Sequence, residues 1–217
     1  MSEDIKIELE SFFENSRGLL QFMTMYNCAI KEVRTKFEIL NDNLSVEYDR
    51  NPIEMIKSRI KTPESIIKKL KRKGLSYDID AIVENIYDIA GVRVICSFVE
   101  DIYVVAKMLS SQDDIKVLEI KDYIKNPKPN GYRSYHMIVE IPVFFAQCRK
   151  NMKVEVQLRT IAMDFWASLE HKMRYKKDIE GVSAVYKELR DCAEIIASTD
   201  LKMQEINKSI SAMKEKH

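Results

Sequence analysis

The stretch from Asp122 to His136, DYIKNPKPNGYRSYH, combines side-chain types that suit a bound nucleotide. Lys128 lies in a loop that prolines stiffen, and Gly131 lets the backbone approach a ligand closely. In a strand after Gly131, Tyr132 and His136 would share one face about 13 Å apart, at about 3.3 Å per residue. This spacing predicts a platform for a base and a donor for phosphates. The alternative is a core tyrosine beside a histidine that is satisfied within the protein.

Two carboxylates could do chemistry on that nucleotide. Glu155 is central on the polar face of VEVQLRT, and Asp88 precedes Arg93 where a helix should meet a strand. One carboxylate on each of two strands suits a divalent metal that bridges a polyphosphate, and a carboxylate can also accept a proton from a hydroxyl. The alternative is structural ion pairing, for example of Asp88 with Arg93.

A third group of candidate residues is basic. Arg59 and Lys61 precede Thr62-Pro63, and Lys69 follows it. A planar guanidinium can stack on adenine, and ammonium groups can contact a triphosphate. On their own these three residues would be ordinary surface residues.

The elements that must position these residues begin with a helical pattern. Apolar spacing from Leu9 through Leu40 predicts one long helix or two shorter helices, with Gly18 as a candidate break. The polar residues 41–51 predict a loop, and the segment that follows Pro52 predicts an edge strand.

The middle of the chain alternates between helical and extended patterns. A helix should begin at Thr62-Pro63 and end at Gly74, because threonine caps helices and proline fits the first helical position. A second helix is expected from Asp78 to about Ala90, followed by a buried strand, GVRVICSF. The remaining patterns predict a helix over 101–111 and strands over 116–123, 133–144 and 152–159. The fold class is therefore α+β, a mixed β-sheet flanked by helices.

The C-terminal segment carries an apolar seam from Val185 to Met213, with steps of four and three residues. A heptad seam of this kind seeks another helix. The sequence leaves two partners open, the chain's own N-terminal helix and a second subunit.

Composition limits the class of protein. The 35 basic and 34 acidic residues nearly balance, so net charge gives no pull toward nucleic acid or membrane. The four cysteines have no close spacing of the kind that binds zinc. Acidic Glu3, Asp4 and Glu8 stand where a signal peptide is basic, and no apolar run approaches the ~20 residues that span a bilayer. We expect a cytoplasmic protein with reduced thiols.

Four segments in order resemble the small alarmone synthetases, stand-alone relatives of the RelA/SpoT synthetase domain. They are SRIKTPESIIKKLKRKG, DIAGVRVICSF, KDYIKNPKPNGYRSYH and VEVQLRTIAMDFWASLEHKMRYKK. The segments NPIE, KSRIK and AMDFWASLEHK are more similar to the RelP branch than to the RelQ branch. Stimulation of the enzyme by its product looks like a property of the RelQ branch.

The resemblance implies an enzyme that transfers pyrophosphate from ATP to the ribose 3′-hydroxyl of GDP or GTP, making ppGpp or pppGpp with Mg²⁺. The ATP-binding residues it implies are Arg59 and Arg93 around the adenine and Lys61, Ser65 and Lys69 at the phosphates. The acceptor residues it implies are Tyr132 on guanine, Lys128 and His136 at the phosphates and, less directly, Lys121. Asp88 would hold the magnesium, while Glu155 would activate the 3′-hydroxyl or share the metal. The role of Asp164 stays open.

The resemblance also implies a single synthetase domain over 1–217, nucleotidyltransferase-like, with a helical region over 1–50, a catalytic core over 51–177 and a C-terminal helix over 178–217. Relatives with a hydrolase domain use a histidine and aspartate cluster, and none of the histidines here is followed by aspartate, so no hydrolysis is expected. The implied assembly is a homotetramer. Two alternatives remain: a pyrophosphokinase that acts on adenine nucleotides or a tRNA 3′ end, and a non-catalytic regulator that binds RNA or nucleotides.

Overall fold

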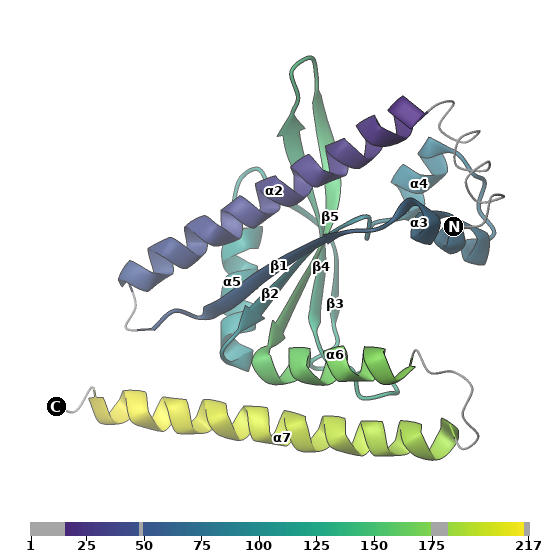
Figure 1. Cartoon of the computed structure of the whole chain (residues 1–217). Coiled ribbons are helices and arrows are strands. Elements are labelled where there is room, and N and C mark those ends of the chain that lie inside the picture. The colour runs from purple at the N-terminus through teal and green to yellow at the C-terminus, as the bar shows by residue number, and fades with distance from the viewer. Residues whose placement is uncertain (1–15, 48–49, 175–181, 215–217) are drawn as a thin grey trace.

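The computed structural model describes residues 16–47, 50–174 and 182–214, and Figure 1 shows a central sheet with helices around it. The elements in chain order are α2 (Ser16–Glu47), β1 (Ile53–Ile60), α3 (Pro63–Lys73), α4 (Ile79–Asn85), β2 (Ala90–Cys96), α5 (Val99–Ser110), β3 (Lys116–Asp122), β4 (Tyr135–Phe144), β5 (Arg149–Thr160), α6 (Ile161–Arg174) and α7 (Val182–Lys214).

The five strands form one sheet in the order β1-β2-β5-β4-β3. Strands β2 and β5 run parallel, whereas the other three neighbouring pairs are antiparallel. The prediction of a mixed sheet in an α+β fold is confirmed, and β1 is an edge strand as expected. Residues on β2 therefore lie directly beside residues on β5, with Gly91 opposite Glu155 and Arg93 opposite Gln157.

The hydrophobic core lies on the face of the sheet that α2 crosses (Figure 1). Alternate residues of the central strands point into it, because side chains alternate between the two faces of a strand. Val92, Val94, Val154, Val156 and Met137 are all buried there. The intervening residues of the same strands point to the opposite face, and these include the polar candidates of β2 and β5.

The N-terminal helix differs from its sequence prediction in two ways. Gly18 lies inside α2 and does not break it, and α2 continues to Glu47, so the loop predicted over 41–51 is wrong for its first part. Leu44 is only 3% exposed. Its burial against the core outweighs the weak helix propensity of the polar residues around it.

The two short helices before β2 hold the basic residues and Asp88 in place. Helix α3 is as predicted: the Thr62 side chain accepts a hydrogen bond from the Ser65 amide, and Gly74 ends the helix with a positive φ of 65°. Helix α4 ends at Asn85, well before the predicted Ala90. Ile86 and Ile89 are buried in the core without being helical, so their apolar spacing mimicked a longer helix.

The C-terminal helix α7 packs on α6 and α5 (Figure 1). In Figure 1 it lies below the sheet and away from α2, so packing on the chain's own N-terminal helix is not what the structure shows. In the first half of the seam Leu189 and Ile196 are partly buried and pack with Trp166, whereas Val185 is 45% exposed. In the second half the apolar residues Met203, Ile206, Ile210 and Met213 are exposed.

Two further observations bear on the class of protein. Among the described residues, no helix is both long enough and apolar enough to cross a membrane. All four cysteines are free thiols.

Candidate active site

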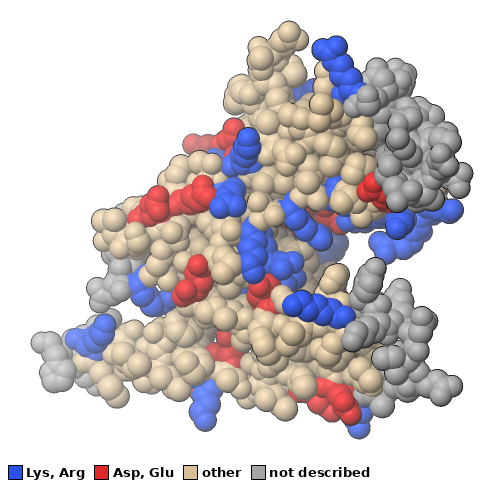
Figure 2. All heavy atoms as spheres, in the orientation of Figure 1, with Lys and Arg blue, Asp and Glu red and all other residues tan. Residues whose placement is uncertain are grey.

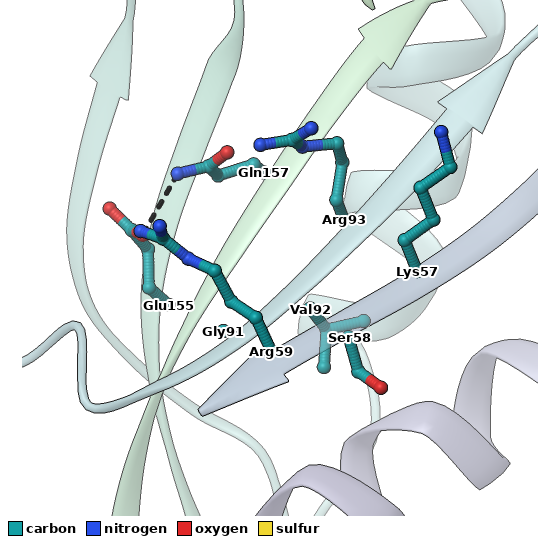
Figure 3. A pocket seen from close by; sticks show the side chains of 8 residues that line it. All are labelled: Lys57, Ser58, Arg59, Gly91, Val92, Arg93, Glu155 and Gln157. Carbon is teal, nitrogen blue, oxygen red and sulfur yellow. Dashed lines mark hydrogen bonds between the residues drawn. The ribbon is translucent and has the colours of Figure 1, made fainter. Parts of the chain in front are cut away.

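A pocket of about 200 Å³ opens on the polar face of the sheet over β1, β2 and β5. Figure 3 shows Arg59, Arg93 and Glu155 among the side chains that line it. Arg59 lies across Gly91, where an added Cβ would be 3.4 Å from the Arg59 Cγ. Because Gly91 has no side chain, the Arg59 side chain can lie over the sheet at this position.

Asp88 lies between two of the predicted ATP-binding lysines. Its carboxylate accepts hydrogen bonds from Lys61 Nζ and Lys69 Nζ, each at 2.8 Å. Burial raises the pKa of Asp88, but these two ammonium groups outweigh burial and hold that pKa below its usual value. Ser65 lies at the start of α3, where its Oγ accepts a hydrogen bond from Thr62. The alternative of an Asp88–Arg93 ion pair is wrong, because Arg93 pairs with Asp164 instead.

Tyr132 and His136 touch, so the predicted extended separation between them is wrong. Strand β4 begins only at Tyr135, and residues 131–134 are not extended strand, because Gly131 adopts a φ of 87°. The Tyr132 hydroxyl is 2.8 Å from His136 Nε2, and the two rings are 5.8 Å apart between centroids. Tyr132 is half-buried against α7, yet His136 and the hydroxyl face the polar side of the sheet.

Lysines border this aromatic pair on one side. The Lys128 ammonium lies 4.6 Å from the ring centre of Tyr123 and 4.8 Å from that of Tyr132. Partial burial of that ammonium lowers the pKa of Lys128. Lys121 is opposite His136 in the β3–β4 pairing and forms an ion pair with Glu119 at 2.8 Å. Sequence prediction and structure agree that these two lysines lie near the pair.

Glu155 belongs to both groups. It lines the arginine pocket, and its carboxylate is 3.5 Å from His136 Nδ1 and 2.9 Å from Gln157 Nε2. Burial raises the pKa of Glu155, whereas hydrogen bonds from His136 and Gln157 lower it below the usual value. Burial, with smaller contributions from Arg159 and Lys128, lowers the pKa of His136 although Glu155 raises it, which favours the neutral imidazole. The pair is thus a carboxylate beside a neutral histidine.

The donor set around Asp88 and Glu155 fits a magnesium ion. Among the described residues, no group of three or more histidine, cysteine, aspartate or glutamate side chains could form a complete cage for a metal. Mg²⁺ does not need one, because it is usually held by one or two carboxylates together with substrate phosphates and water. Asp88 and Glu155 lie close enough for the charge of Asp88 to raise the pKa of Glu155. The carboxylate oxygens of Asp88 and Glu155 are hard donors that lie near each other, and such donors suit this mode of binding.

Sequence reasoning missed two residues of the site and left a third without a role. Gln157 and Arg159 lie on the same face of β5 as Glu155, so their two-residue spacing was an available signal. Asp164 is on α6 and accepts hydrogen bonds from Arg93 at 3.1 Å and from Arg159 at 3.0 Å. No spacing in the sequence relates Asp164 to residues on β2, because only the fold brings α6 there.

Figure 2 shows lysine and arginine side chains gathered at the middle of this face, between α2 above and α6 and α7 below. The chain as a whole is nearly neutral, so this basic region is local. It can attract the phosphates of two nucleotides, while Tyr132, Arg59 and Arg93 supply flat surfaces for bases. Fold and site together define a nucleotide-binding enzyme domain with one carboxylate beside each of two parallel strands.

Comparison with known proteins identifies the family. The family described as "Region found in RelA / SpoT proteins" matches residues 58–180. GTP pyrophosphokinase YwaC of Bacillus subtilis (strain 168) is 46% identical over 188 residues, 87% of this chain and 90% of that protein.

Two solved structures agree with this match. Small alarmone synthetase 1 from Bacillus subtilis, bound to its product pppGpp, superposes with a TM-score of 0.82 at 34% identity, over 90% of this chain and 99% of that one. Small alarmone synthetase 2 from the same organism gives a TM-score of 0.79 at 45% identity, over 88% and 98%. The chain belongs to the RelA/SpoT family, and its likeness within the family is to the small alarmone synthetases.

Proposed function

We propose that this protein transfers pyrophosphate from ATP to the ribose 3′-hydroxyl of GDP or GTP, which makes ppGpp or pppGpp. The activity follows from the relatives named GTP pyrophosphokinase and from the relative that binds pppGpp. The observation in this chain that carries it is the position of Glu155, which lines the arginine pocket and also contacts His136 of the tyrosine cluster. One carboxylate therefore lies between two sites that can each hold a nucleotide.

The donor ATP is assigned to the pocket of β1 and β2. In this proposal Arg59 and Arg93 hold the adenine between their guanidinium planes, and Lys61, Ser65 and Lys69 contact its phosphates. Support comes from the pocket that both arginines line and from the two lysine ammonium groups that meet at Asp88. Phosphates would draw those ammonium groups away from Asp88 and free its oxygens.

The acceptor GDP or GTP is assigned to the tyrosine cluster. Tyr132 would stack on guanine, Lys128 and His136 would contact the acceptor's phosphates, and Lys121 would act from further away. The closeness of the Lys128 ammonium to Tyr132 supports a base and a phosphate group at adjacent positions.

In the transfer itself, the acceptor's 3′-oxygen bonds to the β-phosphorus of ATP, the bond from that phosphorus to the bridging α–β oxygen breaks, and AMP leaves. The 3′-hydroxyl proton needs an acceptor, and Glu155 is the proposed base because hydrogen bonds from His136 and Gln157 keep it ionised. Magnesium held by Asp88, with or without Glu155, would neutralise phosphate charge as it builds up. His136, as a neutral imidazole, orients Glu155 through its Nδ1 proton.

The test is to incubate purified protein with ATP, magnesium and one acceptor at a time: GDP, GTP, AMP, ADP, ATP alone or tRNA. Products are resolved by anion exchange and located by phosphorus NMR. Guanosine 3′-diphosphate products support the proposal. Product on an adenine nucleotide or a tRNA end would favour the alternative acceptor, and absence of product with every acceptor would favour a non-catalytic regulator that binds RNA or nucleotides.

The proposal extends to assembly and to the branch of the family. We propose that the chain acts as a single synthetase domain in a homotetramer, built through its terminal helices, which the exposed half of the α7 seam supports. Membership of the RelP branch, synthesis without hydrolysis, and a cytoplasmic location, where ATP and GTP are found, stay predictions.

A further inference from the structure

Five side chains of the site form a closed ring of polar contacts, four of them hydrogen bonds and the fifth a longer contact between His136 and Glu155. Arg159 Nη2 contacts the Tyr132 hydroxyl at 2.7 Å, and that hydroxyl contacts His136 Nε2 at 2.8 Å. His136 Nδ1 lies 3.5 Å from Glu155, which accepts from Gln157 Nε2 at 2.9 Å. Arg159 Nη2 closes the ring by contacting Gln157 Oε1 at 3.2 Å.

The direction of each bond in this ring is fixed by what its two ends can do. A guanidinium only donates and a carboxylate only accepts, so Arg159 is the origin and Glu155 is the end. The Tyr132 oxygen accepts from Arg159 and its proton therefore goes to His136 Nε2. His136 then keeps its proton on Nδ1 and donates it toward Glu155. Two chains of donors thus run from Arg159 to Glu155, one through Tyr132 and His136 and the other through Gln157.

Arg159 is itself held from the opposite side by Asp164. Its Nη1 donates to Asp164 Oδ1 at 3.0 Å, and only 4% of Arg159 is exposed. The same carboxylate also receives Arg93 Nη1 at 3.1 Å and the Lys57 ammonium at 3.4 Å. Asp164 therefore fixes an arginine of the ATP pocket and the arginine of the ring with one carboxylate.

Within the described part of the chain, the contacts around Asp164 leave a buried donor atom of each arginine without a hydrogen-bond partner. Among the described residues, the Nε atoms of Arg93 and Arg159 are the buried side-chain nitrogens and oxygens without a hydrogen-bond partner. A buried donor without a partner is destabilising, because it has lost its hydrogen bond to water. Three cations around one carboxylate add mutual repulsion between the arginines. Because the fold tolerates this destabilisation, we attribute the position of the Arg159 guanidinium to its effect on the orientation of neighbouring side chains.

We propose that Arg159 is a positioning residue of the acceptor site, which sets the orientation of Tyr132 and Glu155 together through its two donor chains. Asp164 fixes Arg159 and so aligns the acceptor site with Arg93 of the ATP pocket. This inference rests on the proposed function, since it assigns Arg159 to the acceptor side of that reaction. It predicts that Arg159 affects use of GDP and GTP, that Lys57 does not, and that Asp164 affects both nucleotides.

The test compares Arg159→Met with Lys57→Met, which removes a cation from the same carboxylate but belongs to neither chain. Arg159→Met should raise KM for GDP and lower kcat, with a combined loss in kcat/KM of about tenfold or more, the scale of one charge-assisted hydrogen bond. Its KM for ATP should stay near the wild-type value. Lys57→Met should leave KM for GDP unchanged, and Arg159→Lys, which keeps charge and donors, should recover part of the loss.

A double-mutant cycle with Tyr132→Phe tests whether Arg159 acts through the tyrosine hydroxyl. Tyr132→Phe keeps the ring and cuts one chain, so Arg159→Met should cost a smaller factor in that background than in wild type. Equal factors in the two backgrounds, or equal loss of ATP and GDP use in Arg159→Met, would overturn the inference.

Two controls keep the outcome readable. Thermal unfolding of each variant identifies loss of fold; if Arg159→Met does not fold, Tyr132→Phe and Gln157→Met cut the chains one at a time, and wild-type GDP kinetics in both would overturn the inference. Calorimetric binding of GDP gives a second readout that does not require turnover. Wild-type protein without any product refutes the proposed function, whereas an active wild type with unaltered acceptor kinetics in the variants refutes only the role of Arg159.

Discussion

Tyr132 is the residue on which the assignment of the two nucleotides depends. Tyr132→Ala should weaken use of GDP and GTP and leave ATP binding nearly intact, because stacking of an aromatic on a base contributes about 1 to 3 kcal/mol. Initial rates with each nucleotide varied in turn give the two KM values. Equal loss of affinity for ATP and GTP would show that the tyrosine supports the whole sheet face and not the acceptor alone.

Glu155 carries the proposed chemistry. Glu155→Gln keeps the size of the side chain and removes its charge, so kcat should fall by about a hundredfold or more, the scale expected for loss of a general base, with modest change in nucleotide affinity. Single-turnover kinetics separate the chemical step from product release. A variant that retains most of its turnover would mean that Glu155 only orders His136 and Gln157.

At the scale of residues, the sequence predicted which side chains meet better than how they meet. The patterns singled out Arg59, Glu155, Tyr132 and His136, and the family resemblance added Arg93 beside Arg59. The sequence put Tyr132 and His136 far apart, because the positive φ of Gly131 cannot be inferred from a strand pattern. It gave Asp164 no role, because contacts from α6 to β1 and β2 depend on tertiary packing alone.

Helix α7 packs against the loop that precedes β4 and makes one very close contact with it. A Cβ added to Gly131 would be only 2.5 Å from the Ala193 Cβ. Gly131→Ala should therefore destabilise the fold, by about 1 to 3 kcal/mol for the positive φ and more for the clash. Adding Ala193→Gly should recover the part due to the clash, although Ala193→Gly alone costs about 1 kcal/mol in a helix. Thermal unfolding of the three variants measures this, and strictly additive effects would contradict the close contact.

The docking of α7 also involves a buried carboxylate. Asp200 is 6% exposed and accepts a hydrogen bond from the Thr160 hydroxyl at 2.6 Å. Burial raises the pKa of Asp200 above the ordinary value of 3.8, despite that hydrogen bond. The folded state therefore binds this proton more tightly than the unfolded state does. Its contribution to stability is present at low pH and is lost as the pH rises from the unfolded pKa through the folded one.

Asp200→Asn removes that dependence. The variant should have the Tm of wild type at acidic pH. Its Tm should exceed that of wild type increasingly as the pH rises from the unfolded to the folded pKa of Asp200. The Asn amide oxygen can still accept the hydrogen bond from the Thr160 hydroxyl. Calorimetric scans of both proteins across the pH range give the difference. A difference that stays constant with pH would mean that Asp200 is not the titrating group.

At the scale of elements, the sequence predicted types and order well and ends less well. Strands with a clear alternation, such as β5, and helices with a cap and a stop, such as α3, match their predictions within a few residues. The predicted ends of the helices that stop at Glu47 and Asn85 were wrong for one reason. Isoleucine and leucine are buried in the core whether or not their backbone is helical, so apolar spacing alone does not mark a helix end. Two residues of the α7 seam, Leu189 and Ile196, pack against α6, a partner that the sequence had not indicated.

Assembly is the prediction that belongs to the whole molecule. Ile206 and Ile210 are 46% and 50% exposed on α7. If the proposed homotetramer forms, changing both to Asp should convert it to smaller species, because an unpaired charge buried in an apolar seam costs several kcal/mol. Ser211→Asp, which adds charge at another position of the same helix, is the matched control. Light scattering that shows unmodified protein as a monomer at micromolar concentration would refute assembly through this helix.

The parallel pairing of β2 with β5 has a consequence for protein synthesis. Helix α5 and strands β3 and β4 intervene between these two strands, so Arg93 is translated long before Glu155. Pairs that are far apart in sequence form late and carry a large entropic cost. A nascent or prematurely released chain that ends before Glu155 can contain Arg59 and Arg93, yet it lacks the carboxylate to which we assign the transfer. We therefore expect translation products that end before β5 to make no alarmone.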